Sequence, residues 1–103
     1  METTATQKLP LFSLGRTVAT PGALEALASN RVVTAAYLKR HVTGDWSECG
    51  DDDAEANRQS VKDGSRIFGV YFLPDRTKVW VITEAADDRG RRSATTILLP
   101  EEY

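Results

Sequence analysis

The chain has 103 residues, a formal net charge of −2 and a sequence pI of about 5.3. This length predicts one domain with a single core and leaves no room for a separate cofactor domain. The mildly acidic balance excludes a chain that is basic throughout, as many nucleic-acid-binding domains are. Because the chain has one cysteine and no apolar run of membrane-spanning length, we expect a cytoplasmic protein without internal disulfides that does not enter a membrane.

The first part of the chain predicts a strand followed by a helix. Residues 1–10 are mostly polar and are expected to be disordered or frayed, with one domain over residues 11–103. Residues 11–20 alternate loosely and contain Val and Thr, which favours a short extended segment. A helix is expected to begin after Thr20, a good N-cap, and to end near Asn30.

Two more helices are expected before the chain turns to strands. In residues 31–42 the apolar side chains recur at helical spacing, and Gly44 is a natural terminator. The acidic run at residues 51–53 places carboxylates where the positive end of a third helix would lie. Gly64 would end that helix.

The remainder of the chain predicts β-structure. Residues 65–84 have the form strand, turn, strand, with Pro74 and Asp75 in the turn. Apolar residues occupy both alternating sets of positions, so we expect either central strands or a sheet covered on one side and partly occluded on the other. Residues 93–100 predict a further strand after a charged loop.

The predicted order is β-α-α-α-β-β-β, and the short connections between the last three strands favour an antiparallel meander. The helices must bury their apolar stripes, and the sheet offers the large apolar face that they need. We therefore predict an α+β fold with the helices packed on one face of a small, mostly antiparallel sheet of three to four strands.

Residues 37–48 contain the single histidine and an Asp-Trp pair that follows a glycine. His41 has the chemistry of a general base, but a base needs a reaction partner and an orienting group. We favour a half-buried histidine at a helix end. For Trp46 we favour an anchor of the loop in the core over stacking on a ligand, and Asp45 suits a cap of the next turn.

No metal site or cofactor is expected. The acids at 51, 53 and 55 match the start of a calcium loop, but Ala56 stands where that loop needs glycine and Lys62 where it needs glutamate. No phosphate-binding glycine loop and no hydrolase motif occurs in the sequence. The arginines of residues 87–92 can hold phosphate, yet neighbouring aspartates oppose their field, so a solvated loop is favoured.

The blocks LGRTVATPGALEAL, LKRHVTGDWSE, DGSRIFGVYFLPDRTKVWVITEA and SATTILLPEEY, in this order, resemble a family of small uncharacterised proteins of bacterial plasmids and integrative conjugative elements. The resemblance covers nearly the whole chain and implies a mobile-element setting without an established activity. Members are often labelled "plasmid-related protein" or "type I restriction endonuclease subunit M". The second label does not fit, because the chain lacks NPPY-type and glycine-rich cofactor motifs. Residues 86–91 look like an insertion relative to the family.

A second resemblance is architectural. A helix-borne histidine followed by a β-meander that ends in TTILLP is similar to small toxin nucleases of the barnase–EndoU–colicin–RelE type. This resemblance implies His41 as the base in RNA cleavage, with Lys78, Thr83 and Thr96 near the phosphate. The acidic balance of the chain opposes it, since phosphates favour a basic groove.

Three functions are left open, in this order. The first is a non-enzymatic accessory protein of a mobile element that binds a protein partner, such as a component of host defence. The second is a small RNA-cleaving nuclease, the one case in which nucleic acid is the partner. The third is a small-ligand or peptide-binding module that uses Trp46, Trp80 and Tyr71. The candidate binding residues are Asp45, Trp46, Trp80 and Arg92, and the sequence leaves the oligomeric state open.

Overall fold

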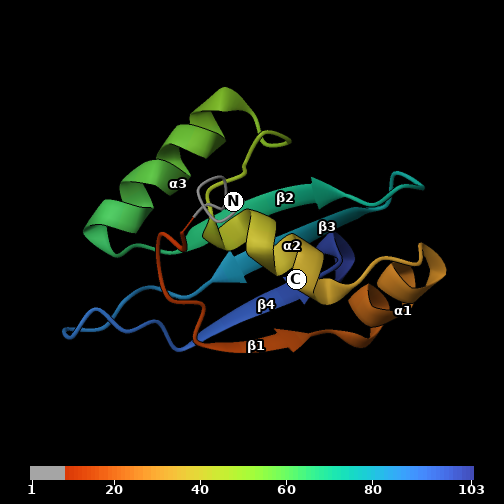
Figure 1. The fold of residues 1–103 in the computed structure, drawn as a ribbon, viewed down its shortest axis with the longest axis horizontal. Coiled ribbons are helices and arrows are strands. Elements are labelled where there is room, and N and C mark those ends of the chain that lie inside the picture. The colour runs from red at the N-terminus through yellow and green to blue at the C-terminus, as the bar shows by residue number, and fades with distance from the viewer. Residues whose placement is uncertain (1–8) are drawn as a thin grey trace, which may run out of the picture.

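The structure, a computed structural model, describes residues 9–103. Within them the chain forms, in order, β1 (Arg16–Ala19), α1 (Pro21–Ser29), α2 (Thr34–Val42), α3 (Asp51–Asp63), β2 (Ile67–Phe72), β3 (Lys78–Thr83), β4 (Ala94–Leu98) and the 3-10 helix η2 (Pro100–Glu102) (Figure 1). The predicted α+β class and element order are confirmed. The expectation of a frayed segment at residues 1–10 falls mainly on residues 1–8, outside the described residues.

The four strands form one sheet in the order β1-β4-β3-β2. β2, β3 and β4 are antiparallel neighbours, as the predicted meander requires. β1 pairs in parallel with β4, from Arg16 beside Ala94 to Ala19 beside Ile97. The three helices, β2 and β3 all lie between these two paired strands in the chain, which gives the long connection that a parallel pair needs.

Local chemistry fixes the ends of the helices. The side chain of Thr20 accepts a hydrogen bond from the backbone N–H of Ala23 at the start of α1. Three aspartates occupy the first turn of α3, next to its positive end. Gly64 ends α3 in the left-handed conformation, with φ of 84°. No helix in residues 9–103 is long and apolar enough to cross a membrane.

The helices cover one face of the sheet. Figure 1 shows α2 lying across that face and α3 beside the β2 edge. The core between helices and strands holds Ala23 and Leu27 of α1, Tyr37 of α2 and Ala54 of α3, together with Ile67, Tyr71, Val79, Val81 and Ile97 of the sheet. Because side chains alternate along a strand, the residues between these core positions point to the opposite side.

We call that opposite side the uncovered face. On the meander strands it carries Phe68, Val70, Phe72, Lys78, Trp80, Ile82, Thr96 and Leu98. On β1 it carries Arg16 and Val18, the register partners of Ala94 and Thr96. Its members in β2 stay partly exposed, whereas Ile82 and Leu98 are buried. Of the two arrangements that the sequence leaves open, the structure shows the sheet covered on one side and partly occluded on the other.

The chain end supplies the partial cover. Glu102 in η2 accepts hydrogen bonds from Thr20, from the Gly22 N–H and from the Leu99 N–H. The hydrogen bond from Thr20, followed by those from the backbone, lowers the pKa of the Glu102 carboxyl. This latch at the start of α1 fixes η2, and the Tyr103 ring then lies edge-on to Trp80 at 5.5 Å between centroids.

Candidate functional site

His41 lies in the last turn of α2, fully buried against the sheet. The ring can approach the sheet because residue 69 of β2 is a glycine. A Cβ at Gly69 would stand 2.6 Å from His41 Nδ1. Glycine inside a strand often marks such a close approach. The rings of Phe12, Trp46 and Tyr71 surround the imidazole, with centroids 5.4, 6.1 and 6.4 Å away.

Both nitrogens of His41 have protein partners. The Trp46 Nε1–H donates to Nδ1 at 3.3 Å, and Nε2 lies 3.0 Å from Thr83 Oγ1. An indole N–H is only a donor, so Nδ1 accepts and the neutral ring carries its proton on Nε2. His41 Nε2–H therefore donates to Thr83.

The chain of hydrogen bonds continues in one direction. Thr83 Oγ1 lies 2.7 Å from Thr95 Oγ1, and Thr95 Oγ1 donates to the Leu14 carbonyl at 2.7 Å. Because the Thr95 proton goes to Leu14, Thr95 accepts from Thr83. Four side chains in series thus connect α2, the following loop, β3, β4 and the segment before β1. We call Trp46, His41, Thr83 and Thr95 the buried polar chain.

This environment holds the imidazole neutral. Burial, followed by the nearby positive charge of Arg92, lowers the pKa of His41 to about 3. A general base must reach the proton that it removes. With both nitrogens bonded and no exposed surface, His41 is placed to support the fold.

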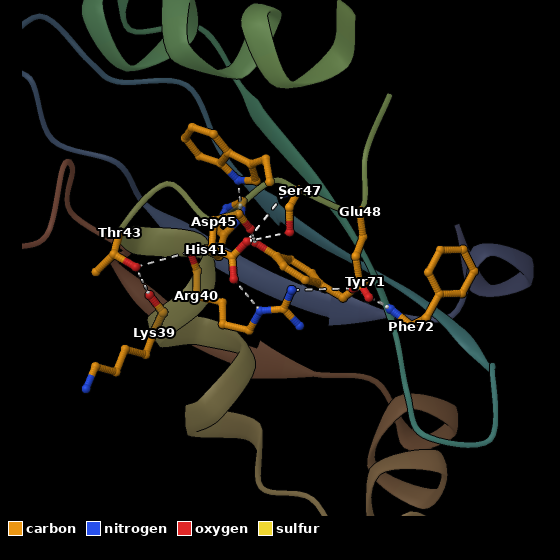
Figure 2. Close-up of polar contacts among 10 residues, drawn as sticks. Lys39, Arg40, His41, Thr43, Asp45, Ser47, Glu48, Tyr71 and Phe72 are labelled. Carbon is orange, nitrogen blue, oxygen red and sulfur yellow. Dashed lines mark hydrogen bonds and ion pairs between the residues drawn. The ribbon is translucent and has the colours of Figure 1, made fainter. Parts of the chain in front are cut away.

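The loop after α2 is held by Arg40, as Figure 2 shows. Arg40 Nε bonds Asp45 Oδ2 at 2.7 Å, and its guanidinium lies 4.7 Å above the Tyr71 ring. The Tyr71 hydroxyl donates to the Asp45 carbonyl at 2.9 Å. The hydrogen bond from Arg40 lowers the pKa of the Asp45 carboxyl. Asp45 therefore caps and anchors this loop, and Trp46 beside it is only 2% exposed.

Arg92 belongs to the loop that precedes β4 and is buried. Its guanidinium donates to the carbonyl oxygens of Ser65 at 2.8 Å, Glu84 at 3.0 Å and Ser60 at 3.0 Å. These acceptors join the end of α3, the start of β2 and the end of β3. Burial lowers the pKa of Arg92. The contacts engage both terminal nitrogens with the protein's own backbone, so little of the group faces a ligand.

Trp80, Lys78 and Thr96 lie on the other side of the sheet. Thr95 belongs to the buried polar chain, so its neighbour Thr96 points to the uncovered face. Trp80 is half-buried and contacts Phe68 edge-on at 4.8 Å between centroids. Lys78 is exposed, with Nζ 5.7 Å from the Phe72 ring centroid. Trp80 and Lys78 also line one cleft with Phe68 and Val70.

The candidate residues thus divide between the two faces. The structure brings His41 to Trp46 and Thr83, and it brings Trp80 to Lys78. It does not bring His41 together with Lys78 and Thr96, because the sheet lies between them. The nuclease set and the binding set remain predictions, but neither forms a single cavity.

Two further residues, Asn57 and Gly69, position these groups and are not among the candidates drawn from the sequence. Asn57 in α3 is 4% exposed; its side chain donates to the Phe68 carbonyl at 2.9 Å and accepts from the Phe68 N–H at 3.0 Å. Nothing in its helical surroundings marks it. Gly69, inside the apolar run IFGVYF, does carry a signal, since an isolated glycine in a strand indicates close backbone approach.

No group of three or more His, Cys, Asp or Glu residues in the described part of the chain is arranged to hold a metal ion. Compared with protein-family models, curated proteins and solved structures, the chain matches none. The two resemblances drawn from the sequence therefore stay predictions.

Proposed function

We propose that this chain is a non-enzymatic accessory protein that works by binding a macromolecular partner on the uncovered face of its sheet. The observation that carries the proposal is the contrast in how polar and aromatic groups are used. On the helix side they bond one another, and on the uncovered face Phe68, Trp80 and Lys78 remain open to solvent to different degrees.

The face has the composition of a recognition surface. Large aromatic residues are enriched at interfaces. Trp80 stays partly exposed and lines the same cleft as Phe68 and Lys78. Arg76 stands 5.2 Å above the Phe72 ring and Lys78 stands 5.7 Å from it, which adds two positive charges at one end. The mobile-element setting belongs to this proposal. The protein partner that the sequence favours stays a prediction, which the experiment below tests.

The nuclease alternative has less support from the geometry. Its base would be a buried His41 with two bonded nitrogens, on the far side of the sheet from Lys78 and Thr96. The ligand-binding alternative shares Trp80 with the proposal, whereas Trp46 and Tyr71 are core residues.

The test is capture from a bacterial lysate by immobilised full-length protein, with both proteins and nucleic acids identified before and after nuclease treatment. Lys78→Glu and Trp80→Leu alter the uncovered face, and Arg89→Glu in the exposed loop before β4 is the matched charge reversal. We expect the first two variants to lose the species that wild type and Arg89→Glu retain. Equal capture by all four proteins would contradict the proposal.

A further inference from the structure

The uncovered face continues into a cleft beside α3. The cleft has a volume of about 450 Å³, with Phe68, Val70 and Trp80 as its sheet wall and Asn57 on its helix wall. Arg66 and Lys78 also line it. Arg66 directly precedes β2 and Lys78 pairs with Phe72 at the other end of that strand, so the two cations stand at opposite ends of the cleft.

Three aromatic side chains cluster on the uncovered face, edge to face with one another. Trp80 contacts Phe68 at 4.8 Å and Tyr103 at 5.5 Å between ring centroids, and Tyr103 is 69% exposed. The three rings come from an edge strand, an inner strand and the chain end. Aromatic rings on the open face of a small sheet are a common platform for unpaired bases, because every base has a flat π-face.

The side chains that line the cleft carry two positive charges, Arg66 and Lys78, against one negative charge, Asp53. Arg16, Arg66, Arg76 and Lys78 lie on or at the rim of the uncovered face and are all exposed. Glu84 is paired with Arg66 at 3.8 Å, and Asp53 lines the helix wall of the cleft. The other acids of α3's first turn are Asp51 and Asp52. Phosphates are therefore favoured along the strands and disfavoured along α3.

The edge of β2 is closed to an added strand. Asn57 occupies both backbone groups of Phe68, and the Phe72 N–H donates to Glu48 Oε1 at 3.1 Å. A peptide that binds by adding a strand to a sheet gains its affinity from backbone hydrogen bonds to an open edge. With that edge filled, the cleft favours a ligand that binds through flat rings and negative charge.

We propose that the partner on the uncovered face is a single-stranded nucleic acid, bound without strong sequence preference by base stacking on Trp80 and Phe68 and by phosphate contacts to Arg66 and Lys78. This inference rests on the proposed function, for which it names the class of partner. It involves no cleavage of the strand.

The test is fluorescence anisotropy of labelled oligo-dT and oligo-rU, each about 12 nucleotides long, with the full chain at about 50 mM salt. We expect saturable binding with Kd on the order of 10⁻⁵ M that weakens as salt rises. Trp80→Leu should weaken it about tenfold and Lys78→Glu roughly fivefold, whereas Arg89→Glu should change it less than twofold. Unchanged amide NMR spectra would show that each variant is folded. If Trp80→Leu does not fold, Lys78→Glu still tests the inference, because Lys78 is exposed.

Three results would overturn the inference. The first is no saturable binding of either oligonucleotide up to about 1 mM protein, well above the Kd expected of non-specific binding. The second is equal weakening by Arg89→Glu and Lys78→Glu. The third is polyglutamate binding that matches oligo-dT and is insensitive to Trp80→Leu, which would mean charge attraction alone. If oligonucleotides fail while nuclease-resistant capture of a protein still depends on Lys78 and Trp80, the proposed function stands and only the class of partner is wrong.

Discussion

The two faces of the sheet use the same kinds of side chain in opposite ways. On the helix side, Trp46 and His41 are buried and each polar atom of the buried polar chain meets another protein group. On the uncovered face, Trp80 and Lys78 keep solvent-facing surface. A histidine and a tryptophan close together in sequence attract attention as a site, but here the pair that looks reactive supports the fold.

The contrast shows that the hydrogen-bond partners of a side chain within the protein decide whether it stabilises the fold or is free to bind. A buried donor or acceptor without a partner costs about 1–3 kcal/mol, so completing the buried polar chain stabilises one arrangement of α2, β3 and β4. Exposed aromatic rings and cations contribute little to that stability. Mutations should therefore separate the faces, with large effects on unfolding from one and on binding from the other.

The largest effect is expected from His41→Ala. The change leaves a cavity beneath α2 and removes the acceptor of Trp46 and the donor to Thr83. We expect the free energy of unfolding to fall by about 3–5 kcal/mol in urea titrations. Lys39→Ala, two residues before His41 in α2 and exposed, is the control and should cost less than about 0.5 kcal/mol. A loss for His41→Ala no larger than that of the control would remove the structural role.

The stability of the protein at low pH should also depend on His41. The folded-state pKa of His41 is about 3, below its unfolded value of 6.5. Its contribution is therefore complete above pH 6.5 and is lost as the pH falls from there toward 3. Between pH 7 and 4.5, before most carboxylates titrate, we expect stability to drop by about 2.5 kcal/mol. The measurement is urea unfolding at stepped pH, and His41→Gln should flatten the slope; an equal slope in both proteins would contradict the assignment.

Gly69→Ala sharpens the account of how the ring reaches the sheet. The new methyl carbon would stand 2.6 Å from His41 Nδ1 and 3.0 Å from Tyr71, so we expect a loss of about 1–3 kcal/mol. In the His41→Ala background the methyl has space, and the two losses should sum to more than the double variant shows. Thermal or urea unfolding of the four proteins completes the cycle. Strict additivity would mean that the two residues do not meet.

The smallest effect on stability is expected on the uncovered face. Lys78 is exposed and begins β3, so Lys78→Glu should change the free energy of unfolding by less than about 0.5 kcal/mol. Its effect should instead be on binding. If Lys78→Glu lowered the free energy of unfolding about as much as His41→Ala, the uncovered face would also be part of the core. The two faces would then not differ in role.

Much of the fold could be predicted because its signals are local. Thr20 marks the start of α1 by its side-chain hydroxyl, and Gly64 marks the end of α3 by its left-handed backbone. Alternation along β2 assigns Phe68 and Tyr71 to opposite faces. The parallel pairing of β1 with β4 could not be predicted from the sequence, because no local sequence signal specifies it. Whether the helices take the face of Tyr71 or of Phe68 is likewise decided by the whole set of contacts.

The site was harder to predict for the same reason. His41 and Thr83 are 42 positions apart, and Thr95 lies 12 positions further. Such a chain of hydrogen bonds exists only after the sheet has formed. The sequence does predict that Trp46 anchors a loop, and its 2% exposure agrees. The sequence does not predict that the sheet separates His41 from Lys78 and Thr96.

One measurement tests the central claim, that the uncovered face binds while the helix face supports the fold. The two tryptophans give separate indole N–H signals in a ¹⁵N-correlated NMR spectrum. On titration with oligo-dT of about 12 nucleotides, the account predicts that the Trp80 signal shifts progressively and that the Trp46 signal, held by His41, stays in place. A shift of Trp46 with Trp80 unmoved would contradict the account and return the site to the helix face.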